Sequence, residues 1–244
     1  MAIIVLQHMD IGGPGRLGLT LRDQAFKLDI RRVDLLGPKG IPVDFDGVDG
    51  VIALGGEQNV GEDHPWMKAE LDFLRETHAR QIPLVGICLG HQLIAHALGS
   101  EVGPLAAPGS EWGFTTVDIL PPGQTETILA GIPWRMRVLQ AHGCEVKAIP
   151  QGATLLASSA LCKVQAFRSG LRTYGFQFHP ECDRLMIDAL VRTSGASIAR
   201  AGLSPATVSR QAEEHYAEYA RHADRLADNL ASFLFLTMKL VHRR

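Results

Sequence analysis

The stretch "PLVGICLGHQLIAHAL", Pro83 to Leu98, decides the fold. Its first five residues have the length and composition of a buried strand, and the residues after Cys88 follow a helical pattern. Open parallel sheets bind their ligands at the carboxyl ends of their strands. The sequence therefore predicts that the thiol of Cys88 lies at a functional edge of a sheet.

A steric argument explains why glycines flank this cysteine, at Gly86 and Gly90. A sharp turn from strand to helix leaves little room for neighbours, as in the nucleophile elbow of hydrolases. The helix N-terminus also favours the thiolate over the thiol. The alternative is that Cys88 is a small buried core residue, which is the usual place of a free cysteine.

Apolar runs of strand length recur along the chain. They are residues 2–7, 27–33, 50–54, 83–87, 115–120, 137–140, 153–159, 164–168 and 173–178. Helical segments separate the early runs; in residues 65–80, Pro65 suits a first turn, and Met67, Leu71 and Leu74 form an apolar stripe. This alternation predicts an α/β fold of three layers, a mostly parallel sheet with helices on both faces. The later, closely spaced strands predict an antiparallel extension.

The length of 244 residues predicts a single domain over residues 1–244. Its catalytic core is expected over about residues 1–192, and a helical extension over about residues 193–244. The extension contains a long helix that opens with a Ser204 cap, and Pro205 follows this cap. The apolar run at residues 233–241 is too short to span a bilayer and predicts a packed helix.

Charge and cysteine content exclude several classes of protein. The 24 basic and 26 acidic residues are interspersed, so no patch is expected to bind nucleic acid or an anionic membrane. Four scattered cysteines are too few for a disulfide scaffold and indicate the reducing cytoplasm. The N-terminus has no basic lead or cleavage site, which predicts mature sequence.

A second strand-like run, "TYGFQFHPE" at residues 173–181, ends in a histidine. A cysteine nucleophile needs a base to accept its proton, and that base needs a partner that fixes its tautomer. His179 and Glu181 suit these two roles, and Pro180 between them restricts the backbone. A lone histidine at a strand end is more often an ordinary packed residue, but the elbow at Cys88 favours the catalytic reading.

Together these motifs resemble the class I glutamine amidotransferases. "GICLGHQ" at residues 86–92 and "GFQFHPE" at residues 175–181 follow that family's order of cysteine, histidine and glutamate. "LGGEQNV" at residues 54–60 resembles the loop of the oxyanion strand. "QAHGCEV" at residues 140–146 and "EWGF" at residues 111–114 resemble the "SHGD" segment and the Glu-aromatic-Gly turn of the glutamine-hydrolysing domain of GMP synthetase.

The resemblance implies a role for each matching residue. Cys88 would attack the side-chain amide of glutamine, His179 would protonate ammonia and then activate water, and Glu181 would orient His179. Backbone N–H groups of Gly56 and Leu89 would hold the oxyanion.

A further three positions match those that hold the amino-acid end of glutamine in the family: Gln92, Gly143 and Cys144. The chain also departs from the family. Glu57 stands where relatives usually have proline, which implies a less rigid loop with an extra charge. Cys144 replaces an acidic or aromatic residue, and Cys182 is expected to be a packing residue only.

One glycine pattern suggests another chemistry. Gly13, Gly15 and Gly18 satisfy GxGxxG, and Asp34 follows at the distance of a ribose-binding acid. Residues intervene between the strand and this turn, and Pro14 removes an amide that would face a phosphate. We therefore interpret the pattern as an ordinary Gly-rich loop.

No metal site or cofactor is expected. His91 and His96 are five residues apart on a helix and so do not share a face, as a pair of metal ligands would.

The sequence predicts a stand-alone glutaminase that supplies ammonia to a separate ATP-dependent synthetase, since it carries neither SGGxDS nor a Walker loop. Two alternatives stay open: a γ-glutamyl hydrolase or transferase acting on a glutamyl conjugate, and a non-catalytic nucleotide-binding regulator. With His179 as base, activity should fall on the acidic side near pH 6.5, within about one unit.

Overall fold

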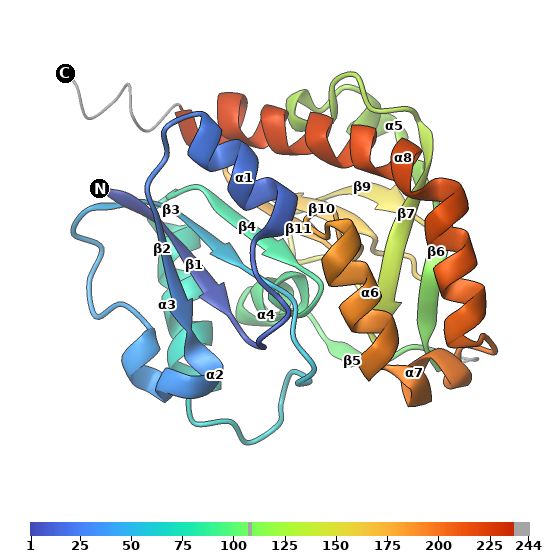
Figure 1. Ribbon diagram of the computed structural model, residues 1–244. Coiled ribbons are helices and arrows are strands. Elements are labelled where there is room, and N and C mark those ends of the chain that lie inside the picture. Colours follow the sequence, from blue (N-terminus) through green and yellow to red (C-terminus); the bar gives the residue numbers. More distant parts are fainter. Residues whose placement is uncertain (107–108, 237–244) are drawn as a thin grey trace.

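The computed structural model describes residues 1–106 and 109–236 of the chain (Figure 1). Its centre is a sheet of nine strands in the order β2-β1-β3-β4-β11-β10-β9-β6-β7. The strands are β1 (Ala2–Gln7), β2 (Leu28–Arg32), β3 (Val48–Ala53), β4 (Leu84–Ile87), β6 (Glu111–Ile119), β7 (Arg135–His142), β9 (Thr154–Ser158), β10 (Ala166–Ser169) and β11 (Thr173–Phe176). A separate two-stranded sheet joins β5 (Val102–Pro104) to β8 (Cys144–Val146).

The strand directions divide the large sheet into two parts. Strands β2, β1, β3, β4 and β11 are parallel, and β10, β9, β6 and β7 continue the sheet in antiparallel pairs. The predicted α/β fold with a mostly parallel sheet and an antiparallel extension is confirmed. The small β5–β8 sheet was not predicted.

Helices cover both faces of the sheet (Figure 1). They are α1 (Gly15–Asp23), α2 (Val33–Leu36), α3 (Met67–Ala79), α4 (Leu89–Ala97), α5 (Pro121–Gln124), α6 (Arg184–Thr193), α7 (Gly195–Arg200) and α8 (Pro205–Asn229). Short 3₁₀ turns occupy η1 (Gly37–Gly40) and η2 (Thr127–Leu129), and a π-helical segment, η3 (Leu230–Phe235), continues α8.

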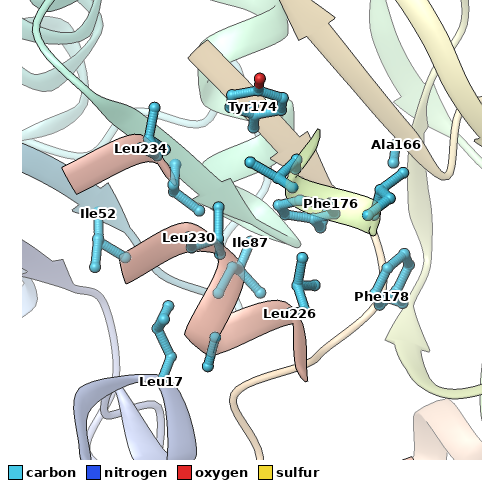
Figure 2. Close-up of a cluster of buried hydrophobic side chains, with 14 of the residues drawn as sticks. Leu17, Ile52, Ile87, Ala166, Tyr174, Phe176, Phe178, Leu226, Leu230 and Leu234 are labelled. Atoms are coloured by element: carbon cyan, nitrogen blue, oxygen red, sulfur yellow. The ribbon is translucent and has the colours of Figure 1, made fainter. Parts of the chain in front are cut away.

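Alternation along β1 explains the three layers. Ile3 and Val5 belong to one core cluster, together with residues of α1, α8 and η3, whereas Ile4 and Leu6 belong to another with residues of α3 and α4. Successive side chains of a strand point to opposite faces, so one buried strand supplies both clusters. Figure 2 shows the first cluster, in which Leu226 and Leu230 lie near Ile87.

The helix starts test the capping predictions. Ser204 Oγ accepts the Thr207 N–H at 3.1 Å, and Pro205 occupies the first helical position of α8, as predicted. Helix α3 begins at Met67, so Pro65 lies just before the helix and not in its first turn. The proline excludes the preceding residue from helical conformation and thereby limits how far the helix can extend.

The C-terminal segments pack against the rest of the molecule. Helix α8 contacts α1, α6, β6 and β7, while the division of the chain near residue 192 stays a prediction. Of the apolar run at residues 233–241, Leu234 and Phe235 are buried and residues 237–241 lie outside the described residues. Within residues 1–106 and 109–236, no helix combines the length and apolar character needed to cross a membrane.

Candidate active site

Cys88 occupies a sharp turn between β4 and α4. Its backbone has φ 51° and ψ −105°, a conformation that non-glycine residues rarely adopt. A Cβ on Gly86 would come within 2.5 Å of the Gly90 carbonyl oxygen, and one on Gly90 within 2.0 Å of the Ala53 carbonyl oxygen. Both glycines are therefore required by close backbone approach, as the sequence predicted.

His179 and Glu181 approach this thiol from the neighbouring strand. Strand β11 runs parallel to β4 with Phe176 paired to Ile87, so its continuation reaches the same edge of the sheet. His179 Nδ1 is 2.8 Å from Glu181 Oε1, and both side chains are buried. A Cβ on Gly55 would lie 3.0 Å from His179 Cε1 and 3.6 Å from Cys88 Cβ, which places the ring and the cysteine side by side.

The environment of His179 favours its charged form. Burial disfavours the imidazolium, but the Glu181 carboxylate and the Cys88 thiolate outweigh it and raise the pKa of His179 well above its ordinary value. Its second nitrogen, Nε2, is buried and has no hydrogen-bond partner among the described residues. The ring can therefore exchange a proton with a group in the cavity while Glu181 holds Nδ1.

Cys182 forms a hydrogen bond to the triad in addition to packing in the core. Its thiol donates to Glu181 Oε1 over 3.7 Å, so the expectation that it serves only in packing is incomplete. Burial raises the pKa of Cys182 to about 12, which keeps it a thiol. Ligand-type atoms of His179, Glu181 and Cys182 lie within 4.8 Å of one another, close enough to share a metal ion. The carboxylate, however, already pairs with the ring within this group.

A cavity of about 330 Å³ opens in front of Cys88. Cys88, His179, Gly56 and Leu89 line it, and Glu57 stands at its wall. In the described part of the chain, the backbone N–H groups of Gly56 and Leu89 have no hydrogen-bond acceptor. Two residues with an unpaired N–H group thus line the cavity that contains the thiol.

The cavity's other wall comes from the C-terminal helices. Thr193 and Ser194 at the end of α6 and Ser197 and Arg200 of α7 line it. Ser197 Oγ accepts the Trp112 indole N–H at 2.9 Å, which ties α7 to β6. The sequence did not indicate that these helices reach the site.

The three residues expected to hold the amino-acid end of glutamine lie together. Gln92, Gly143 and Cys144 all line the cavity. Gln92 Nε2 donates to the Cys144 carbonyl at 2.9 Å and to Gln177 Oε1 at 3.0 Å, so its amide nitrogen is used within the protein. The Cys144 thiol lies 3.1 Å from Asn59 Oδ1, and partial burial raises the pKa of Cys144.

Two residues that support the site were missed by sequence reasoning. The Tyr219 hydroxyl, on α8, lies 2.6 Å from the His179 carbonyl and 3.0 Å from the Cys182 carbonyl. Gly15 has φ 42°, and a Cβ there would lie 2.1 Å from the Glu181 carbonyl oxygen. Tyr219 carries no local motif, whereas the signal for Gly15 was present in the glycine pattern.

The glycine pattern at residues 13–18 therefore has a structural explanation. It begins α1 directly against Glu181, whose carbonyl accepts the Arg16 N–H at 2.8 Å. Asp34 forms an ion pair with Arg32 at 2.7 Å. The Gly-rich loop therefore packs against the Glu181 backbone, and its interpretation as an ordinary loop stays a prediction.

Comparison with known proteins defines the class. The family model "Glutamine amidotransferase class-I" matches residues 20–185, and the chain belongs to this family of enzymes. The match ends within α6 and does not include α7 and α8.

The individual relatives and solved structures have modest sequence identity to this chain. The chain is 35% identical over 150 residues to a subunit of the glutamine-hydrolysing GMP synthase of Saccharolobus solfataricus, which covers 61% of this chain and 76% of that protein. It superposes with a TM-score of 0.83 and 24% identity on a glutamine amidotransferase from Methylobacillus flagellatus, over 97% of this chain and 94% of that one. A glutamine amidotransferase from Thermotoga maritima gives 0.81 and 24%, over 95% and 98%.

Proposed function

We propose that this enzyme hydrolyses the side-chain amide of glutamine through a triad of Cys88, His179 and Glu181. The Cys88 thiolate adds to the amide carbon, and the oxyanion accepts the N–H groups of Gly56 and Leu89. One such fixed donor typically lowers a barrier by roughly 3 kcal/mol. The C–N bond then breaks, His179 gives its proton to the departing ammonia, and a thioester remains.

Water completes the reaction. Neutral His179 removes a proton from water, which attacks the thioester carbon, and the thiolate leaves as glutamate is released. Glu181 keeps Nδ1 of the ring protonated in both halves, so Nε2 is always the nitrogen that faces the substrate.

One observation carries this proposal. His179 Nε2 is buried and has no hydrogen-bond partner in the described part of the chain. It lies at the wall of a cavity, beside Cys88 in its strained turn. Burying an unpaired polar atom costs free energy. Its presence beside a nucleophile is the arrangement that acyl transfer requires.

We further propose that the ammonia is used by a separate synthetase. The relative from Saccharolobus solfataricus is one of the subunits of a GMP synthase, which supports a division of labour between polypeptides. The 244 residues carry no ATP-pyrophosphatase signature or Walker loop. Adding the purified partner should raise the rate of glutamine hydrolysis if the two work together.

The shape of the cavity supports a second candidate, a hydrolase or transferase of γ-glutamyl conjugates. The cavity extends from the thiol to α7, where Arg200 is exposed and forms no ion pair within the described residues. A conjugate with an anionic leaving group would find a cation there. Faster turnover of such conjugates than of glutamine would establish this function in place of the first.

The deciding experiment measures ammonia and glutamate release from glutamine by the purified chain. Cys88→Ala should abolish release and also labelling by a glutamine-analogue electrophile. Cys162→Ala is the matched control, because Cys162 is fully buried and does not line the cavity. If wild-type protein, with and without candidate partners, neither turns over glutamine or its conjugates nor is labelled at Cys88, the proposal is wrong.

A further inference from the structure

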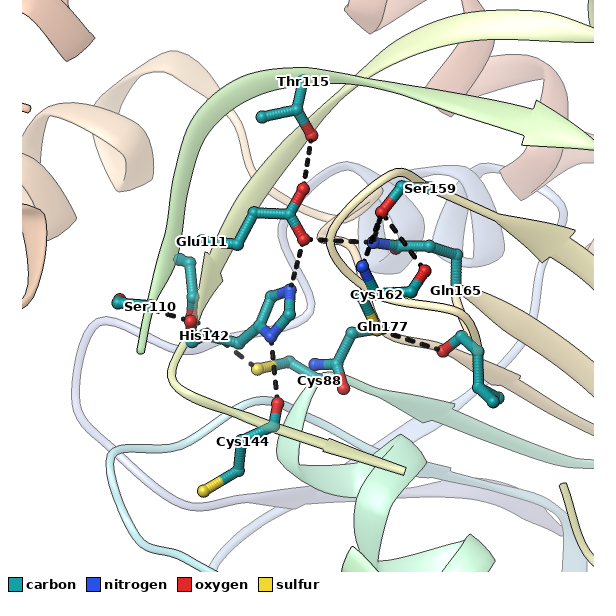
Figure 3. Close-up of polar contacts among 12 residues, drawn as sticks. Cys88, Ser110, Glu111, Thr115, His142, Cys144, Ser159, Cys162, Gln165 and Gln177 are labelled. Atoms are coloured by element: carbon teal, nitrogen blue, oxygen red, sulfur yellow. Dashed lines mark hydrogen bonds and ion pairs between the residues drawn. The ribbon is translucent and has the colours of Figure 1, made fainter. Parts of the chain in front are cut away.

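A second buried histidine and glutamate lie beside the cavity, and the proposed mechanism does not use them. His142 ends β7 and Glu111 begins β6, and the two are paired across the strands. Their side chains are 1% and 3% exposed, with 3.1 Å between Nε2 and Oε2. Figure 3 shows the His142 ring between this carboxylate and the Cys144 carbonyl.

Both ring nitrogens of His142 face hydrogen-bond acceptors. Nδ1 lies 2.9 Å from the Cys144 carbonyl oxygen, which has no hydrogen to give, so Nδ1 must carry one. Nε2 faces Glu111 Oε2, and the protonation of this nitrogen depends on the state of the carboxyl group.

The other contacts of Glu111 identify it as an acceptor. Gln165 Nε2 reaches Oε2 at 3.3 Å, and the Thr115 hydroxyl reaches Oε1 at 3.0 Å. The orientation of the Gln165 amide is fixed, because Ser159 Oγ donates its own hydrogen to the Cys162 carbonyl and accepts from Gln165. Oε2 therefore accepts a hydrogen from Gln165, and the Glu111 carboxyl group is held in place by Thr115, Gln165 and His142.

The 3.1 Å contact between Nε2 and Oε2 needs one hydrogen, so His142 and Glu111 together carry no net charge wherever that hydrogen lies. The titratable groups near the His142 ring are His91 of α4, Cys88 of the β4–α4 turn, Cys144 of β8 and Glu111 of β6. Burial lowers the pKa of His91 to about 3, so His91 is neutral and does not compete. The pair is then a neutral unit inside the protein, as buried charges require.

The His142 ring fixes the turn that follows it. The Cys144 carbonyl accepts from His142 Nδ1 and, at 2.9 Å, from Gln92 Nε2. The Gly143 carbonyl accepts the Leu105 N–H at 2.9 Å. The Gly143 N–H, by contrast, has no acceptor in residues 1–106 and 109–236, and Gly143 lines the cavity. With its carbonyls held, the turn offers this donor to a substrate.

We infer that His142, held in place by Glu111, is a positioning residue that sets the Gly143–Cys144 turn to bind the carboxylate end of the glutamyl substrate. The role rests on the proposed function of the cavity. It does not touch the reacting amide, so it should affect substrate binding and leave the reactivity of the thiol unchanged.

The first test determines the protonation of His142 directly. In ¹⁵N-histidine-labelled full-length protein at pH 7, Nδ1 of His142 should carry hydrogen, because it faces the Cys144 carbonyl oxygen. An unprotonated Nδ1 in the wild-type protein would overturn the inference. This result does not depend on turnover, so failure here and failure of the glutaminase proposal are distinguishable.

The second test compares two reagents for Cys88. Iodoacetamide reports the reactivity of the thiol alone, and a glutamine-analogue electrophile also needs the turn. His142→Ala should slow the analogue about tenfold, as expected for the loss of a buried hydrogen bond, and leave the iodoacetamide rate unchanged. KM for glutamine should rise more than kcat falls, and Glu111→Gln should show the same pattern more weakly.

Glu126→Gln is the matched control, because this mostly buried carboxylate binds Arg168 and the Tyr174 hydroxyl and does not line the cavity. It should alter neither rate. Equal slowing of both reagents in His142→Ala, or no slowing of the analogue, would contradict the inference. If His142→Ala does not fold, Glu111→Gln has nearly the same shape and decides the question in the same assays.

Discussion

The backbone of Cys88 stores strain at the site. A residue with a side chain in such a conformation costs of order 1–3 kcal/mol, and the surrounding close contacts impose it. Glycine would adopt the same conformation without penalty. The elbow thus lowers the stability of the fold at the position where a side chain is needed for chemistry.

We therefore predict an inverted order of stability at this position. Cys88→Gly should be more stable than Cys88→Ala by about 1 kcal/mol, although both are inactive. Urea denaturation monitored by circular dichroism measures the difference. Ala95→Gly, at a buried position in the middle of α4, serves as control and should cost about 1 kcal/mol. A less stable Cys88→Gly would show that the elbow is unstrained.

The raised pKa of His179 changes the expected pH dependence. The sequence predicts loss of activity near pH 6.5, but Glu181 beside the ring stabilises the imidazolium also in the thioester. Hydrolysis of the thioester needs the neutral ring, so kcat should begin to fall at a pH above 6.5 as the solution becomes more acidic. Glu181→Gln should move this limb to lower pH, since burial alone lowers the pKa. A wild-type limb below pH 6.5 would contradict the assigned pair.

At the scale of the element, α8 reaches from the periphery to the triad. Tyr219 projects from this helix and bonds the carbonyls on both sides of Pro180 and Glu181. The helix also contacts α1, whose first residue, Gly15, lies directly against the Glu181 carbonyl. Two helices at opposite ends of the sequence therefore fix the segment that carries the base.

Removing one hydroxyl of α8 should impair the chemistry. Tyr219→Phe leaves two carbonyls without this donor, and we expect kcat to fall about tenfold because the His179 ring shifts. Steady-state kinetics with glutamine measures the change. Tyr216→Phe, one turn earlier, is the control: its hydroxyl bonds Arg16 and the Arg184 N–H, and its loss should lower stability with little change in kcat. Equal effects of the two variants would exclude a specific role for Tyr219.

Sequence analysis predicts the site residues that are marked by a short motif in their own neighbourhood. Cys88, His179 and Glu181 stand at the ends of apolar runs with flanking glycines or proline, and these patterns extend over only a few residues. Tyr219 and the pair of Glu111 and His142 act through contacts 30 to 40 residues apart along the chain, with no period or spacing to mark them. The three-residue strands β5 and β8 are too short for any alternation to show.

At the scale of the whole molecule, the C-terminal helix belongs to the core of the sheet. The family match ends at residue 185, yet α8 and η3 bury Tyr219, Leu226, Leu230 and Phe235. Burying each such side chain contributes about 1.5–3 kcal/mol. The sum is comparable to the total stability of a typical domain, about 5–15 kcal/mol.

Deletion of residues 204–244 should therefore prevent folding. We expect residues 1–203 alone to lose cooperative thermal unfolding and to bind a hydrophobic dye, because one face of the sheet is left uncovered. Calorimetry and dye fluorescence measure this, with the intact chain as the reference. A cooperatively folding fragment would show that α8 is an accessory.

Strands β4 and β11 carry the thiol and the imidazole, and the Cys88 N–H donates to the Phe176 carbonyl at 2.8 Å. The two groups can separate only if the middle of the sheet opens, because the two strands are hydrogen-bonded neighbours. On heating, loss of activity and global unfolding should therefore have the same midpoint temperature. The slowest-exchanging amide protons should lie on these two strands.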